Sequence, residues 1–204
     1  MRPGLAILVN TLIEEPPVLY SGLLADATFH EQLLAFDKDI ANTAREAKCR
    51  CGGALHSGNF PRKPRGGPRL GPEHNLRFSF SCAVDGCRSR KTPPSLRFLG
   101  RRVYLTVTVV LISIMQHGIT DQRVARLTEE IGVDRRTVAR WRLWWREAFT
   151  KTPFWQIKRA DFMPPVDEKQ LPGAVLERFT GSTAAERMMA LLHFLAPITG
   201  GKST

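Results

Sequence analysis

The amino-acid sequence predicts a mainly α-helical protein that contains one small segment of β structure. Three observations support this fold class. Apolar residues recur at helical spacing on both sides of the middle of the chain, the stretch 48–100 is rich in proline and glycine, and all four cysteines lie within that stretch. Proline and glycine prevent long helices, so short strands and turns are expected there. With 204 residues, of which 43% are hydrophobic, the chain is long enough to bury a substantial core.

Composition divides the chain into four segments. Residues 1–47 are expected to form an N-terminal helical segment with no chemistry of its own. Residues 48–100 form the β-containing segment, and residues 101–150 form a helical domain. Residues 151–204 form a connector followed by a C-terminal helix.

Both end segments carry local helix signals. In the first, Asp26 or Thr28 is placed to cap one or two helices. In the last, residues 184–195 are apolar at helical spacing, and Pro197 ends the expected helix. The apolar residues of the first segment are Leu23, Leu24, Phe29, Leu33, Leu34, Phe36 and Ile40.

The net charge of +11 is concentrated in two internal segments. Residues 48–102 carry 13 lysine and arginine residues against two acidic ones, and residues 119–159 carry ten against five. Residues 1–47 instead have three basic and seven acidic residues. Segregated positive charge indicates surfaces that neutralise phosphates, whereas a charge that only keeps a protein soluble would be spread evenly.

Neither of two apolar runs predicts a membrane segment. The run 4–13 follows Arg2, but the glutamate and proline residues at 14–17 interrupt it, which a signal peptide does not tolerate. The run 103–115 is shorter than the roughly 20 residues of a membrane-spanning helix, so a buried helix is expected there. We therefore expect a cytoplasmic protein without membrane contacts, associated with the nucleoid if the source is bacterial.

The four cysteines form two close pairs. One residue separates Cys49 from Cys51, 30 residues separate the pairs, and four residues separate Cys82 from Cys87. Glycine in each cysteine turn, at 52–53 and at 86, lets the backbone fold back toward a thiolate. Two cysteine turns brought together by a hairpin supply the four soft ligands of tetrahedral Zn²⁺. The pattern therefore predicts a structural zinc ribbon, although most ribbons have two residues within each pair.

Other interpretations of the cysteines remain open. They are free structural thiols or a redox pair if no metal binds. His56 and His74 are candidate substitute ligands, but a histidine in a basic loop is more often solvated or close to a phosphate. Two clustered pairs in an otherwise cysteine-free chain favour zinc.

The loop between the cysteine pairs is basic. Proline and glycine keep residues 59–69 extended, so the cations project into solvent as phosphate contacts require. A mobile loop that touches nothing is the alternative. The cations of the loop are Arg62, Lys63, Arg65 and Arg69. The residues expected to continue this basic surface after the second pair are Arg88, Arg90, Lys91, Arg97, Arg101 and Arg102.

Residues 122–149 match the pattern of a helix-turn-helix. Leu127 and Thr128 fall where an apolar and a small residue pack the first helix, although alanine or glycine is usual at the second position. Gly132 suits the left-handed backbone of the turn, and Asp134 is a suitable N-cap for the second helix. An ordinary helical hairpin with solvated arginines is the alternative. The residues expected to enter a major groove are Arg135, Arg136, Thr137 and Arg140.

Three tryptophans follow on the same helix. Trp141, Trp144 and Trp145 have helical i, i+3, i+4 spacing, so they share one face. A platform on which bases stack is conceivable. Three tryptophans on one helix face are more often part of a core, which we favour.

The order of these parts resembles the N-terminal DNA-binding region of insertion-sequence transposases that begin with a zinc ribbon. The likeness is one of layout and covers about residues 48–149. It consists of paired cysteines, the basic stretch RSRKTPPSL at 88–96, an apolar helix and a helix-turn-helix. The resemblance implies a small β zinc ribbon beside a helix-turn-helix three-helix core. It also implies that the ribbon and Arg135, Arg136 and Arg140 recognise the ends of a DNA element.

The catalytic half of such transposases has no counterpart here. That half holds two metal ions with three carboxylates from separate strands. The acids after Arg159 lie too close together in sequence to play that part, and there is neither a serine elbow nor a glycine-rich phosphate loop. We therefore expect no complete enzyme, and a catalytic role would require a recombinase or transposase partner.

The predicted function is zinc-dependent binding of double-stranded DNA by a mobile-element accessory protein, a regulator or a truncated transposase. A homodimer would suit a palindromic site. Two alternatives stay open, namely a zinc-ribbon protein that binds RNA and a scaffold subunit of a larger nucleoprotein complex. In the scaffold alternative, the apolar helix at 184–195 would contribute to assembly.

Overall fold

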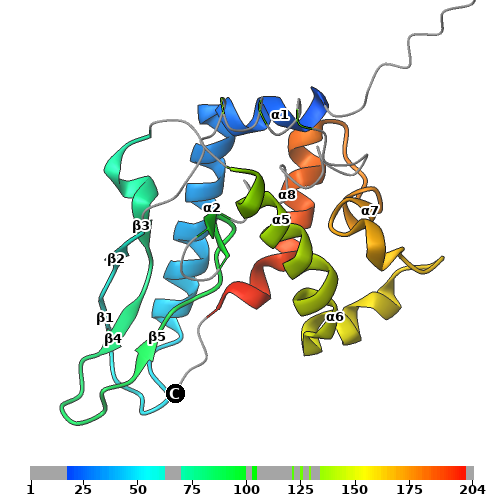
Figure 1. Ribbon diagram of the computed structural model, residues 1–204. Coiled ribbons are helices and arrows are strands. Elements are labelled where there is room, and N and C mark those ends of the chain that lie inside the picture. Colours follow the sequence, from blue (N-terminus) through cyan, green and yellow to red (C-terminus); the bar gives the residue numbers. More distant parts are fainter. Residues whose placement is uncertain are drawn as a thin grey trace, which may run out of the picture.

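The computed structural model describes residues 18–62, 70–99, 103–104 and 134–200, and in addition the single positions Asp121, Ala125 and Glu129. These residues form a mainly helical protein with small antiparallel sheets (Figure 1). The predicted fold class, mainly α with a small β segment, is confirmed at this level.

Two helices open the described chain, α1 (Val18–Ala25) and α2 (Ala27–Glu46). Asp26 separates them, and its carboxylate accepts hydrogen bonds from the backbone N–H groups of Thr28 and Phe29 at 2.9 and 3.2 Å. Asp26 is therefore the N-cap of α2, one of the two residues that the sequence offered for this role. One face of α2 buries Phe29, Leu33, Leu34 and Ala41.

Short antiparallel strands lie beside α2 (Figure 1). The strands are β1 (Leu55–Ser57), β2 (Phe60–Pro61), β3 (Leu76–Arg77), β4 (Phe80–Cys82), β5 (Arg90–Lys91), β6 (Phe98–Leu99) and β7 (Val103–Tyr104). They pair as a sheet of order β1-β4-β5 and as the two-stranded pairs β2-β3 and β6-β7. Leu55 lies opposite Cys82, and Phe80 lies opposite Lys91.

The helix predicted for residues 103–115 does not begin at Val103. Val103 and Tyr104 instead form β7, where Val103 pairs with Leu99 and Tyr104 pairs with Phe98. β-branched and aromatic residues favour this extended conformation, and a partner strand lies a few residues upstream. The rest of the predicted helix lies outside the described residues.

The second half of the described chain is helical. It contains α5 (Arg135–Leu143), the π-helical turn η2 (Trp144–Ala148), the 3₁₀ turn η3 (Phe149–Lys151), α6 (Pro153–Lys158), α7 (Gly173–Leu176) and α8 (Ala184–Leu195). The bounds of α8 are those predicted from the sequence. A capping box explains its start, because the Thr183 hydroxyl accepts from the Glu186 N–H while the Glu186 carboxylate accepts from the Thr183 N–H.

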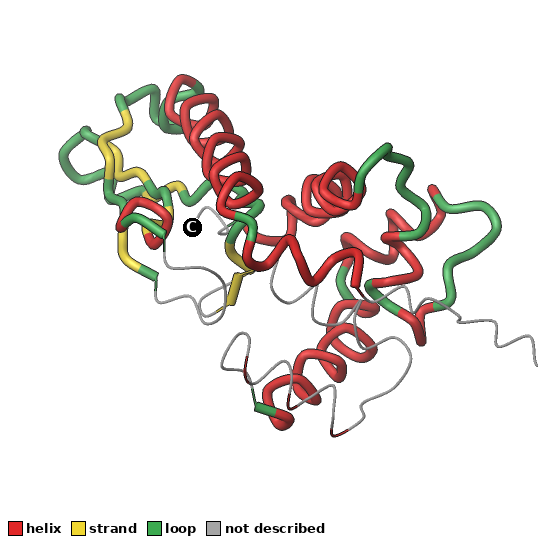
Figure 2. Tube along the Cα trace, turned by 90° about the horizontal axis from the view of Figure 1, so that it is seen from above, coloured by secondary structure: helices red, strands yellow, loops and turns green. Residues whose placement is uncertain are grey.

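One hydrophobic cluster joins the helices. Its buried members come from every segment that composition distinguishes, from Leu23 near the start to Ala196 near the end. Trp145 and Trp155 have no exposed surface, and Trp141 and Trp144 pack against the cluster half-buried. The interpretation of the tryptophans as core is therefore confirmed. Seen from above, the strands lie to one side of this helical body (Figure 2).

A second, smaller cluster lies between α2 and the strands. Its buried members are Ala41, Cys49, Leu55 and Phe80. Helix α2 thus contributes to both clusters and supports the cysteine-containing turns. None of the helices described is both long and apolar enough to cross a bilayer.

Candidate metal centre and nucleic-acid interface

The first cysteine turn follows directly after α2. The Cys49 N–H donates to the Gly53 carbonyl at 3.0 Å, and the Gly52 N–H donates to the Cys49 carbonyl at 2.9 Å. Gly52 has φ +84° and Lys48 has φ 52°, so the chain enters the left-handed region on both sides of Cys49. This folding brings Cys51 back beside Cys49.

The second cysteine turn begins at the last residue of β4. The Cys87 N–H donates to the Val84 carbonyl at 3.1 Å, and the Val84 N–H donates to the Cys82 sulfur at 3.4 Å. Gly86 has φ +79° and Arg88 has φ 47°, which repeats around Cys87 the left-handed geometry of the first turn. The amide donor to sulfur is one that would stabilise a thiolate.

Pairing of β1 with β4 brings the two turns together. All four Sγ atoms lie within 4.8 Å of one another. The Sγ atoms of Cys51 and Cys82 are 3.4 Å apart and those of Cys49 and Cys87 are 3.8 Å apart, and the four cysteines are free. Four sulfurs at about 2.3 Å from one tetrahedral Zn²⁺ would be about 3.8 Å from each other. The cysteines therefore form a cluster whose dimensions suit such an ion.

Gly53 lies against this cluster without room for a side chain. A Cβ atom at this position would lie 2.9 Å from the Cys82 sulfur and 3.4 Å from the Cys51 sulfur. It would also lie 2.5 Å from a methyl carbon of Val84. The close approach of the backbone to two sulfurs thus depends on glycine at this position.

The pKa values of Cys49, Cys82 and Cys87 are shifted in different directions. The Cys51 N–H, which bonds to the Cys49 sulfur, is the main reason why the pKa of Cys49 falls to about 6. At Cys82 the Val84 N–H acts in the same direction, but desolvation and hydrogen bonds with the other three thiols outweigh it and raise the pKa to about 12. At Cys87 the Ser89 N–H lowers the pKa, but hydrogen bonds with the Cys51 and Cys49 thiols outweigh it, and the pKa is raised. Like charges so close together oppose each other's ionisation, and a bound cation would favour the thiolate forms.

Burial around the cluster is one-sided. Cys49 is 8% exposed and packs with the small hydrophobic cluster, whereas Cys51 is exposed. His56 is exposed on β1, and His74 is buried in the 3₁₀ turn η1 (Pro72–Asn75). Among the described residues, the group able to hold a metal contains the four cysteines and neither histidine.

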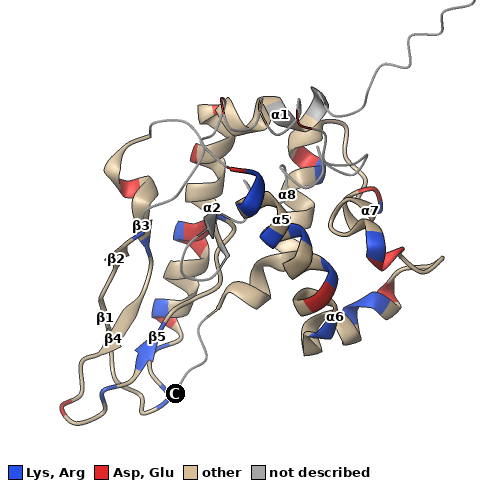
Figure 3. Cartoon of the chain, viewed as in Figure 1, with Lys and Arg blue, Asp and Glu red and all other residues tan. Residues whose placement is uncertain are grey.

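The predicted recognition helix is α5. As expected, Asp134 is its N-cap and accepts from the Thr137 N–H at 2.8 Å. Arg135, Arg136 and Arg140 are exposed, and the blue segments of α5 in Figure 3 are arginines. The Thr137 side chain is instead buried in the cap, since its hydroxyl donates to Asp134 and accepts from Arg140.

Parts of the predicted helix-turn-helix lie outside the described residues. These include Leu127, Thr128 and Gly132. Asp121, which precedes the predicted first helix, forms an exposed ion pair with Arg135. This contact joins the first residue of α5 to a residue 14 positions earlier in the chain.

The basic residues of the cysteine segment have different environments. Arg88 and Arg90 are exposed and Arg62 is half-buried, whereas Lys63, Arg65 and Arg69 lie outside the described residues. Two expected surface cations are less exposed than predicted. Arg97 is 1% exposed, and Lys91 is half-buried and donates to the Ala44 carbonyl near the end of α2. The prediction that the basic surface continues through Arg97 is therefore wrong, because Arg97 is buried and paired with a carboxylate.

That carboxylate belongs to Asp37, which sequence reasoning missed. Asp37 is 1% exposed and holds Arg97 at 2.8 Å. The signal was present, because Asp37 lies one helical turn from both Leu33 and Ala41 on the buried face of α2. A lone acid on an apolar helix face indicates a buried partner.

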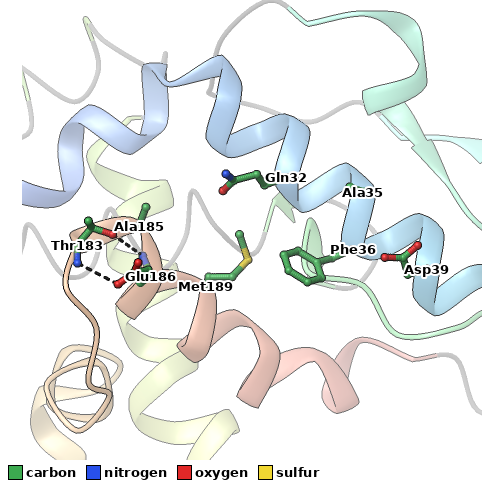
Figure 4. Close-up of a pocket in the computed structure, with 8 residues that line it drawn as sticks. All are labelled: Gln32, Ala35, Phe36, Asp39, Thr183, Ala185, Glu186 and Met189. Atoms are coloured by element: carbon green, nitrogen blue, oxygen red, sulfur yellow. Dashed lines mark hydrogen bonds between the residues drawn. The ribbon is translucent and has the colours of Figure 1, made fainter.

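A surface pocket of about 580 Å³ lies between α2 and α8 (Figure 4). On the α8 side, Thr183 and Glu186 are occupied by the capping box. On the α2 side, Phe36 is 38% exposed and packs edge-on against His193 with ring centroids 4.7 Å apart. Three of the eight lining residues thus have capping or packing roles, and none of the eight is a cysteine of the thiol cluster.

Comparisons with protein-family models, curated proteins and solved structures found no match to this chain.

Proposed function

We propose that this protein binds double-stranded DNA, that α5 is its recognition helix, and that four cysteines hold a structural Zn²⁺. The observation that carries the proposal is the gathering of four free Sγ atoms within 4.8 Å of one another. Sulfur ligands alone, in a closed set of four, are typical of structural zinc sites. The ion would keep the turns around Cys49 and Cys87 together, in a region with little core of its own.

The helix α5 supports binding to a duplex. Its N-terminus is capped by Asp134, and three exposed arginines lie in its first two turns. Residues at the start of a recognition helix meet base edges in the major groove, and arginine bonds there to guanine or to phosphate. The arrangement of cysteine pairs, basic stretch and helix resembles that of transposases, which supports a role as a mobile-element accessory protein, a regulator or a truncated transposase.

The test is selection of bound sequences from a random duplex pool, with zinc measured on the same protein sample. We expect one zinc per chain, an enriched sequence and an affinity that falls steeply with salt. Arg136→Ala should weaken binding by about 1–3 kcal/mol and relax base preference at one position. The matched control is Lys169→Ala, which removes an exposed positive charge far from α5 in sequence.

Two results would reject the proposal. One is equal affinity for all duplexes that survives high salt. The other is folded protein without bound zinc. Competition by structured RNA addresses the alternative function, because the deep, narrow major groove of RNA does not admit a helix. If RNA displaces the selected duplex at equal concentration, RNA binding is the better description.

A further inference from the structure

Two arginines share one aromatic ring on the hairpin β2-β3. The guanidinium carbon of Arg62 lies 4.3 Å from the centroid of the Phe60 ring, and that of Arg90 lies 5.1 Å from the same centroid. Arg62 follows β2 and Arg90 begins β5, so residues distant in sequence meet at this ring. A ring face attracts cations, which holds the two side chains in place.

Arg90 is fixed by hydrogen bonds as well. Its Nε donates to the Ser79 hydroxyl at 2.8 Å, and its Nη2 donates to the Gly58 carbonyl at 2.8 Å. Ser79 has no exposed surface, and its N–H donates to the Asn59 side chain at 3.1 Å. One edge of the guanidinium is thus committed to the protein, while the side chain as a whole stays exposed. A preorganised arginine loses little entropy when it binds an anion.

The shared ring concentrates positive charge. Both guanidinium groups lie close to one centroid, so they are separated by roughly a Debye length or less at physiological salt. Within the described residues, Arg90 has no carboxylate partner.

We propose that Arg62 and Arg90, held by Phe60, form a clamp for a single phosphate group of the nucleic-acid backbone. This proposal rests on the proposed function and adds a second contact with DNA, on an element separate from α5. The planar fork of arginine matches phosphate oxygens, and two such forks suit one phosphate group. Phe60 is a positioning residue that acts through the two arginines.

Variants of Phe60 test the positioning role. Phe60→Leu keeps every charge but removes the ring, so it should weaken binding to the selected duplex by roughly three- to tenfold. Phe60→Tyr keeps the ring and should bind like the wild type. Zinc content and melting temperature, measured on both variants, show whether the fold is intact. A loss confined to Phe60→Leu supports the clamp, whereas equal affinity of both variants and the wild type overturns it.

Salt dependence tests whether one phosphate is shared. Each neutralised phosphate contributes about 0.9 to the slope of log affinity against log salt. The double variant Arg62→Ala/Arg90→Ala should reduce that slope by about one, and each single variant should reduce it by less, because the remaining arginine still pairs with the phosphate. A reduction of about two in the double variant would mean two independent contacts and would overturn the clamp. Arg90→Lys, which keeps the charge without the fork, should also weaken binding, so the test does not depend on alanine variants folding.

Further measurements identify the source of the anion and distinguish failure of the clamp from failure of the proposed function. Inorganic phosphate alone should compete only weakly, because it lacks the contact with α5, and polyglutamate should not compete. Displacement by polyglutamate as effective as by DNA would assign the clamp to an acidic protein and overturn it. If wild-type protein binds no duplex, the proposed function fails. If it binds but no clamp variant differs from it, only the clamp fails.

Discussion

Asp37 and Arg97 form a buried ion pair whose atoms Oδ2 and Nε lie 2.8 Å apart, with side-chain exposures of 0% and 1%. The same carboxylate accepts from the Ser95 hydroxyl and from the Leu96 N–H. Arg97 also donates to the carbonyls of His74 and Leu76, each at 3.0 Å. The pair therefore ties the middle of α2 to the chain leading into β6.

Replacing one partner of this pair should be strongly destabilising. Asp37→Asn leaves the buried Arg97 charge without its counterion, and we expect a loss of about 3–5 kcal/mol in the free energy of unfolding. Urea denaturation measures it. Asp39→Asn, an exposed position on the same helix, is the control and should change stability by less than about 0.5 kcal/mol. Equal stability of the two variants would contradict the buried-pair account.

Loss of one thiol should release the metal. Cys51 is exposed, so Cys51→Ser removes a ligand with little effect on packing. Structural zinc binds with about 10–16 kcal/mol at neutral pH, and the variant should therefore bind zinc far more weakly and melt at a lower temperature. A competing chromophoric chelator and thermal unfolding measure the two effects. Ser57→Ala, an exposed change on β1, serves as the control, and unchanged zinc affinity in Cys51→Ser would refute the site.

Gly53→Ala should weaken zinc binding without removing a ligand. Its methyl group would meet the Cys82 sulfur at 2.9 Å, and a sulfur fixed by an ion cannot move aside. Changes just outside the ligands of a metal cost roughly 10- to 100-fold in affinity, and we expect a loss in that range. Gly22→Ala is the matched control, because a Cβ there meets nothing within 4 Å and α1 should gain stability. Similar zinc affinities for the two variants would contradict the close approach of the Gly53 backbone to the Cys82 sulfur.

The His30 side chain should make the protein less stable in mild acid. Burial lowers the pKa of His30 below 6.5, and its Nε2 lies 3.2 Å from the Leu24 carbonyl. The unfolded chain takes up a proton near pH 6.5 that the folded chain does not bind. The free energy of unfolding should thus be unaffected above that pH and fall as the pH drops toward the lower pKa of the folded state. NMR titration of the ring proton checks this, and titration at or above pH 6.5 would contradict it.

The N-cap of α5 should matter for both stability and binding. Asp134→Ala removes the acceptor of the Thr137 N–H and should cost about 1 kcal/mol of stability. It should also lower DNA affinity, because the start of α5 carries the exposed arginines. Thr183→Ala, at the N-cap of α8, is matched in stability cost and should leave DNA affinity unchanged. Equal DNA affinities of the two variants would show that the start of α5 does not contribute to DNA binding.

Local signals predicted the helices well. The Asp26 cap, the Asp134 cap and the bounds of α8 each depend on residues within one or two turns, so a single segment contains all the information. The tryptophan face was also correctly assigned to the core, because helical spacing alone places those residues together.

Long-range relations were harder to predict. The clustering of Cys51 with Cys82 depends on the register of β1 against β4, which cysteine spacing suggested without fixing. The pairing of Asp37 with Arg97 joins residues 60 positions apart, and no local pattern identifies the partner. Because Val103 pairs with Leu99, β7 replaces the expected start of a helix.

Helix α2 has a consequence for the lifetime of the protein. Its 20 residues extend about 30 Å, and it contributes Phe29 to the main cluster and Ala41 to the cluster beside the thiols. Loss of structure around the cysteines would therefore remove packing from the C-terminal end of α2, a helix that also contributes to the main core. A ligand of the folded state stabilises it more as its free concentration rises, so under the proposed function the zinc supply would set how often the chain opens to proteases. Scarcity of the ion would then reduce the abundance of the protein as well as its activity.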